Sequence, residues 1–125
     1  MKRLAPLLVA LPAAACPPGP ADGSSLQGKG VVAAWRVDGA AAIPAAEPFA
    51  LVVRLCPAEA VLLAVDATMP AHRHGMNYRP SLKPLGGGRW RVEGLLFHMS
   101  GTWELRLDLR HAGRAQSLRQ AVELP

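Results

Sequence analysis

The sequence lacks the residue combinations on which common enzymes depend. It has no serine or cysteine nucleophile beside a plausible base, no paired carboxylates at a predicted pocket, and no glycine-rich phosphate loop leading into a helix. The three consecutive glycines at 86–88 lie between two predicted strands and indicate a hairpin turn. We therefore expect that the protein is not an enzyme.

Cysteine is scarce, since the 125 residues include only Cys16 and Cys56. A blue-copper electron carrier needs a cysteine thiolate close in sequence to a histidine, with a methionine near the last loop. Cys56 lies on an early predicted strand, far in sequence from the histidines and methionines. We therefore expect no centre of that type, and an unpaired Cys56 would be a buried, small apolar side chain.

Long apolar runs are absent except at the N-terminus. Lys2 and Arg3 precede an apolar run at 4–14, and small residues at 13–16 form a processing site, which is the pattern of an export signal. The run is too short, and too interrupted by proline, to be a stable membrane span. The sequence therefore predicts an export signal over residues 1–16 and a periplasmic or otherwise exported domain.

Cys16, at the end of this signal, has three alternative fates. The run Ala13-Ala14-Ala15-Cys16 is similar to a lipoprotein processing site, so we favour a lipid on Cys16 that would anchor the protein to a membrane. Cleavage nearby by an ordinary signal peptidase is one alternative, and a disulfide between Cys16 and Cys56 is the other.

Residues 17–30, PPGPADGSSLQGKG, are rich in proline, glycine and serine and poor in apolar residues. This composition predicts a flexible linker between the signal and the folded part of the chain. Residues 31–125 then form one domain, and the 50% hydrophobic content of the chain is enough to bury a core.

Short runs in which apolar and polar residues alternate fill this domain, and each run is bounded by glycine, proline or aspartate. In the clearest run, TWELRLDLR at 102–110, Trp103, Leu105, Leu107 and Leu109 share one face. The other runs are VVAAWRV, PFALVVRLC, VLLAVDA, RPSLK, GRWRVEG and SLRQAVEL. They predict an all-β fold of about seven strands, an immunoglobulin-like or cupredoxin-like antiparallel β-sandwich. A helix over residues 57–67 is the second interpretation of that segment.

The net charge is modest. Without Lys2 and Arg3, 12 basic residues remain against 9 acidic residues, which gives a formal charge of +3. Most basic residues are single arginines that alternate with apolar neighbours, such as Arg89 and Arg91, as is typical of the solvent face of strands. We therefore expect no binding to nucleic acid.

Histidine and methionine are concentrated in two windows, residues 69–76 and 98–99. Apart from Met1, these windows hold all the methionines and three of the four histidines. The six residues are Met69, His72, His74, Met76, His98 and Met99. The first window follows a predicted strand and the second precedes one, and such connections can meet at one end of a sandwich.

These side chains are the ligands of a predicted copper site. His72, His74 and Met76 alternate, so in an extended segment they would point the same way. Extrapolating the alternation back from Trp103 places His98 outward and Met99 inward. Thioether sulfur with imidazole favours copper, Cu(I) above all, while histidine adds affinity for Cu(II).

Each position also has a structural interpretation. Met69 and Met99 could be core residues, and the two histidines of the first window, which flank Arg73, could be solvated. His98 could be a hydrogen-bonded residue at a strand end. Arg73 and Arg79 place positive charge beside the predicted site, which opposes cation binding and would suit an acidic partner.

The stretch DATMPAHRHGMNYRPSLK, followed by GRWRVEGLLFHMSGTWELRLDL, resembles the YtkA-like and FixH-like group of exported domains. That group combines an A-x-MP-x-H/M-x-H-G-M loop with an F-x-M-x-G-x-W-E-L strand. The resemblance spans residues 66–109 well. It implies a small β-sandwich outside the cytoplasmic membrane, associated with copper handling or with the assembly of respiratory and cytochrome proteins. Carried over by position, it points to Met69, His72, His74, Met76 and Met99.

From these patterns we expect an exported, non-enzymatic protein that stores or delivers a copper ion. The alternative is a metal-free periplasmic interaction module that assists the assembly of a respiratory or haem protein. In that case the loop at 69–78 would be its contact surface.

Overall fold

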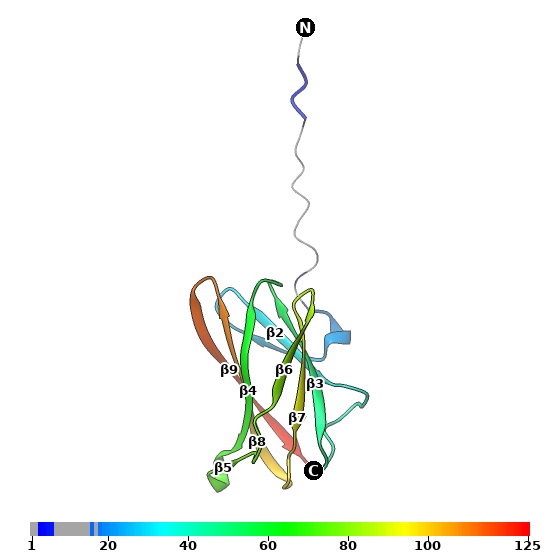
Figure 1. The fold of residues 1–125 in the computed structure, drawn as a ribbon, viewed down its shortest axis with the longest axis vertical. Coiled ribbons are helices and arrows are strands. Elements are labelled where there is room, and N and C mark those ends of the chain that lie inside the picture. The colour runs from blue at the N-terminus through cyan, green and yellow to red at the C-terminus, as the bar shows by residue number, and fades with distance from the viewer. Residues whose placement is uncertain (1–2, 7–15, 17) are drawn as a thin grey trace.

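The computed structural model describes residues 3–6, 16 and 18–125, which form two antiparallel β-sheets packed face to face (Figure 1). Most of the predicted export signal, residues 1–2 and 7–15, lies outside the described residues. Among the residues that are described, no helix has the length and apolarity needed to cross a membrane.

Nine strands and two short 3₁₀ turns make up the described chain. One sheet has the strand order β1-β2-β3-β7-β6 and the other has the order β5-β4-β8-β9. The strands are β1 Ser24–Gln27, β2 Val32–Val37, β3 Phe49–Cys56, β4 Val61–Met69, β5 His74–Gly75, β6 Ser81–Gly86, β7 Arg89–Leu95, β8 Gly101–His111 and β9 Arg114–Leu124. The 3₁₀ turns are η1 Pro20–Asp22 and η2 Pro70–His72.

The predicted antiparallel β-sandwich is therefore confirmed. All seven predicted strands form, as β2, β3, β4, β6, β7, β8 and β9, and the two additional strands, β1 and β5, are short. The helix considered over residues 57–67 does not form, because β4 begins at Val61 and pairs with β8. The glycines at 87 and 88 form the predicted turn between β6 and β7, with φ angles of 63° and 80° that favour glycine.

Alternation along β8 explains why the two sheets pack together. Trp103, Leu105, Leu107 and Leu109 are all almost completely buried between the sheets, as their alternation predicts. Each such side chain stabilises the folded state by roughly 1.5–3 kcal/mol relative to exposure. The largest fully buried side chains are Trp103 and Phe97, whose rings stack with centroids 4.5 Å apart.

The predicted linker over residues 17–30 is wrong in its second half. Ser24–Gln27 form β1, which pairs with β2, and Leu26 is buried at 7% exposure. Before it, Asp22 accepts hydrogen bonds from the Gly19 amide and from Arg54 of β3. Backbone pairing, one buried leucine and one ion pair therefore fix a segment whose composition alone predicted a flexible chain.

The charged side chains on the outer faces of the sheets form ion pairs. Arg91 of β7 pairs with Asp38 and with Glu93, and Arg119 of β9 pairs with Glu104 across the strands at 3.3 Å. The hydrogen bond from Arg91 lowers the pKa of Asp38, and the carboxylate in turn raises the pKa of Arg91. These arginines face the solvent, as their alternation with apolar residues predicts.

Candidate metal centre

The two windows rich in histidine and methionine meet at one end of the sandwich (Figure 1). β4 ends at Met69, η2 turns the chain, and β5 folds back against the end of β4. The connection from β7 to β8, residues 96–100, lies at the same end, and β8 contacts η2. We call the six residues Met69, His72, His74, Met76, His98 and Met99 the His/Met rim.

Three imidazole rings from the two windows lie next to one another. The ring centroids of His72 and His74 are 5.9 Å apart, and those of His74 and His98 are 5.1 Å apart. A metal about 2.0–2.1 Å from a ring nitrogen lies about 3 Å from the ring centroid, so two imidazoles on one ion have centroids about 5–6 Å apart. The observed separations therefore fit two neighbouring ligands of one ion.

Trp103 forms the inner wall of this cluster. Its ring meets the rings of His98 and His74 edge to face, with centroids 5.6 Å and 6.4 Å away. Its indole Nε1 donates a hydrogen bond of 2.9 Å to the carbonyl oxygen of Met99, which fixes the connection before β8. The alternation along the sequence identifies Trp103 only as a core residue, and its contact with the histidines is a finding of the structure.

His98 has an unused polar atom. Its Nδ1 is buried and has no hydrogen-bond partner among the described residues. Leaving a buried polar atom without a partner is costly, and such an atom at a cluster of potential ligands calls for an explanation. A proton donor or a metal ion at this position would satisfy it.

Both methionines of the first window pack against the core. Met69 is fully buried at 1% exposure and stands opposite His74 in the β4–β5 register, so the two side chains share a face. Met76 packs against the core, and its amide donates to the carbonyl oxygen of Ala67. That His74 and Met76 share a face stays a prediction, because β5 ends at Gly75 before Met76.

His72 does not belong to that extended run. It ends the 3₁₀ turn η2, and Arg73 after it takes a left-handed conformation with φ of 53°. The prediction that three alternate residues point one way along a single extended segment is therefore wrong for His72. The turn nonetheless leaves its ring in contact with that of His74.

The predicted orientations of His98 and Met99 are also wrong. His98 is half-buried against Trp103, whereas Met99 is 39% exposed. Residues 96–100 are not a strand, and Gly101 at the start of β8 has φ of 131°, so the alternation cannot be extended backwards through it. Met99 lies at the outer edge of the His/Met rim.

Histidine nitrogens alone do not complete a site. Within the described residues, no group of three or more His, Cys, Asp or Glu side chains is arranged to hold a metal ion. Any ion held here would need thioether sulfur as well as imidazole, or a rotation of the side chains. Soft sulfur with imidazole is the donor set that suits copper.

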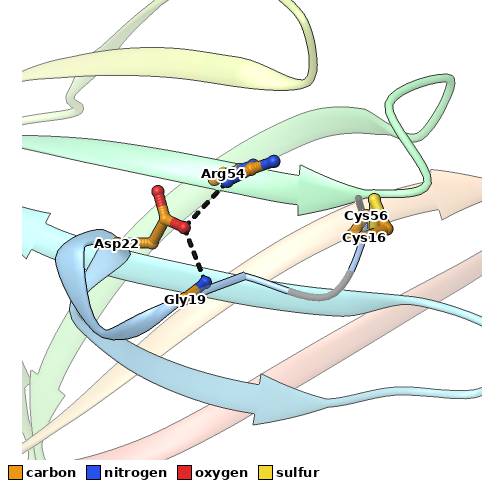
Figure 2. The surroundings of a disulfide bond; sticks show 5 residues. All are labelled: Cys16, Gly19, Asp22, Arg54 and Cys56. Atoms are coloured by element: carbon orange, nitrogen blue, oxygen red, sulfur yellow. Dashed lines mark hydrogen bonds and ion pairs between the residues drawn. A yellow bond between two sulfur atoms is a disulfide. The ribbon is translucent and has the colours of Figure 1, made fainter. Parts of the chain in front are cut away.

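The two cysteines lie at the opposite end of the sandwich. Cys56 at the end of β3 forms a disulfide with Cys16 (Figure 2). The lipid that we favoured on Cys16 is therefore wrong for this state, since a sulfur in a disulfide cannot also carry a lipid. The disulfide is consistent with an oxidising compartment outside the cytoplasm, and it leaves no thiolate at the His/Met rim.

Comparison with known proteins gives no match. No family model, no characterised protein and no solved structure is significantly similar to this chain.

The fourth histidine, His111, ends β8 at the end of the sandwich opposite the His/Met rim and takes no part in the cluster. The candidate metal centre therefore rests on the geometry of the His/Met rim.

Proposed function

We propose that this protein is an exported copper-binding protein that stores or delivers one copper ion at the His/Met rim. The observation that carries the proposal is the contact between His72, His74 and His98, which come from two separate windows. The centroid separations of 5.1 Å and 5.9 Å fit neighbouring ligands of one ion. The unpartnered Nδ1 of His98 supports it, because a ligating nitrogen needs a free lone pair.

Thioether sulfur completes the donor set. Met69 stands opposite His74 in the β4–β5 register, Met76 packs against the core directly after β5, and Met99 is exposed next to His98 in the chain. Methionine can remain a metal ligand in an oxidising compartment, because its thioether needs no deprotonation and cannot be lost to a disulfide. Trp103 closes the inner side, so an ion would enter from the solvent side, where Met99 lies.

A competition titration tests the proposal. Cu(I) is titrated into the purified chain against a coloured Cu(I) chelator, for the wild type and for His74→Ala and His98→Ala. We expect binding tighter than micromolar and at least about a tenfold loss, equal to about 1.4 kcal/mol, in each variant. His111→Ala is the matched control, since His111 lies at the other end of β8, and it should bind as the wild type does.

Two outcomes would contradict the proposal: affinity weaker than micromolar, or equal affinity in the wild type and both rim variants. X-ray absorption on the copper-loaded protein is an independent check, because it counts sulfur and nitrogen neighbours separately. We expect at least one sulfur and at least one imidazole nitrogen. If only nitrogen and oxygen neighbours surround the copper, the methionines are not ligands.

A metal-free interaction module that assists a respiratory or haem protein is the second candidate. It is favoured by Tyr78, which is 61% exposed beside the His/Met rim, and by the lack of a complete His, Cys, Asp and Glu site among the described residues. The second candidate is supported if the wild type binds no copper but still binds a membrane-protein partner, and if Tyr78→Ala loses that partner. Copper binding by the wild type, with or without such a partner, would contradict a metal-free module.

A further inference from the structure

The side of the His/Met rim formed by the first window is positively charged. Residues 67–80 contain Arg73 and Arg79 but no aspartate or glutamate. Both arginines are exposed, and neither is in an ion pair with another described residue, as is also true of Arg110 and Arg114 at the opposite end of the sandwich. Arg73 and Arg79 therefore remain available to an external anion.

The other side of the rim differs. Glu47 follows Ala46, whose amide donates to the carbonyl oxygen of Phe97, and Ser100 donates to a carbonyl oxygen of Pro125. Negative charge is thus present beside residues 96–100 and absent from residues 67–80. The positive surface is confined to the loop that carries His72 and His74.

A hollow of about 630 Å³ adjoins this loop between β4 and β6. Met76, Tyr78 and Arg79 line it, together with Arg106 and Asp66, which form an ion pair at 3.7 Å. The lining mixes polar and apolar groups, with the exposed Tyr78 and Arg79 among them, and such a lining suits a side chain from a partner whose surrounding surface is acidic. We call Arg73, Tyr78 and Arg79, with this hollow, the arginine surface.

We propose that the arginine surface docks an exported protein with an acidic surface, which supplies copper to the His/Met rim or receives it. This inference rests on the proposed copper function. Positive charge beside the rim repels a free cation and attracts an anionic carrier, and such steering changes association rates by about 10- to 1,000-fold at low salt. The surface therefore favours copper exchanged between proteins over capture of free ions.

A protein fits this surface better than an anionic membrane does. The disulfide holds Cys16 at the end of the sandwich opposite the rim (Figures 1 and 2). β4 has nine residues between those ends, a length of about 30 Å at about 3.3 Å per residue. The arginine surface thus faces away from any membrane reached through the N-terminus.

The first arm of the test uses the metal-free protein, so that it does not depend on copper binding. A glutamate-rich peptide is titrated into the isotope-labelled chain and followed by NMR at low salt. We expect signal shifts at residues 73–79 that disappear in Arg73→Glu/Arg79→Glu. The control Arg110→Glu/Arg114→Glu makes the same change of net charge at the opposite end of β8 and β9. This control should still show the peptide-induced signal shifts at residues 73–79.

The second arm measures the rate of Cu(I) capture from the anionic bathocuproine disulfonate complex by stopped flow. We expect Arg73→Glu/Arg79→Glu to be about tenfold slower at low salt, to match the wild type at high salt, and to have equal or higher equilibrium affinity. The control should stay within about twofold of the wild type.

The proposal of an acidic partner would be overturned if both double variants changed the peptide shifts and the capture rate equally, or if neither variant changed them. Binding to vesicles rich in phosphatidylglycerol that Arg73→Glu/Arg79→Glu abolishes would also overturn it, in favour of a membrane. If the wild type takes up no copper but the peptide shifts are seen, the copper function fails while the docking surface stands.

Discussion

Replacing Met69 by leucine separates the two roles that the structure gives this residue. Met69 is buried at 1% exposure at the end of β4, and it shares a face with His74. Its Cε lies so close to Gly101 that a Cβ there would come within 2.8 Å of it. Leucine fills nearly the same volume but removes the sulfur, so packing is retained while one candidate ligand is lost.

The expected cost in stability is small. A volume-conserving apolar exchange costs less than about 1.5 kcal/mol, whereas Met69→Ala would cost about 2–5 kcal/mol because it leaves a cavity. For a domain of about 100 residues, 1 kcal/mol corresponds to roughly 4–8 °C in Tm. Met69→Leu should therefore melt within about 10 °C of the wild type, and Met69→Ala well below it.

The expected cost in copper affinity is large. If the sulfur of Met69 is a ligand, Met69→Leu lowers Cu(I) affinity at least about tenfold, or about 1.4 kcal/mol. The assay pairs thermal denaturation of the metal-free protein, which gives the Tm, with the chelator competition for Cu(I). Unchanged copper affinity in a stably folded Met69→Leu would refute the reasoning for this sulfur and leave Met69 as a core residue only.

Two further predictions concern Trp103 and Asp22. Copper at the rim should quench the fluorescence of Trp103, because the centroid of its ring lies within 6.4 Å of the centroids of two imidazole rings. A variant with Trp35 and Trp90 changed to phenylalanine isolates the emission of Trp103. Equal quenching by copper in Trp103→Phe would place the ion elsewhere. Burial alone would raise the pKa of Asp22, but the Gly19 amide and Arg54 outweigh it and hold the pKa below its usual value. The stabilisation from this ionised carboxylate is present above the pKa of Asp22 in the unfolded chain, about 3.9, and is lost as the pH falls below it. Asp22→Asn should therefore lower the urea midpoint at pH 7, and the difference in midpoint from the wild type should narrow towards pH 3. A difference in midpoint that does not depend on pH would refute this.

Strand positions were predictable wherever one face of the strand is buried. In β8 the alternation of Trp103, Leu105 and Leu107 with polar residues determines which side enters the core. β1 and β5 have four and two residues, too few for alternation to be recognised. Their positions depend on pairing with β2 and β4, which is a tertiary contact that no local pattern carries.

The meeting of the two windows was predictable from the sequence, whereas the orientation of their side chains was less so. The position of both windows at strand ends indicated that they could meet, and the rings of His74 and His98 do. The errors arose at two backbone positions with positive φ, Arg73 and Gly101, where alternation stops. A signal for the wall of the site was present: Trp103 is the first inward residue after the second window, so its ring had to lie beneath it.

The two ends of the sandwich therefore have different chemical properties. At one end the sulfurs of Cys16 and Cys56 are consumed in a disulfide, so they neither bind an ion nor carry a lipid in this state. At the other end the sulfurs are thioethers, which keep their lone pairs under the same oxidising conditions. If the chain binds copper as we propose, methionine supplies soft sulfur that cannot be lost to a disulfide, and all the methionines apart from Met1 lie at the His/Met rim.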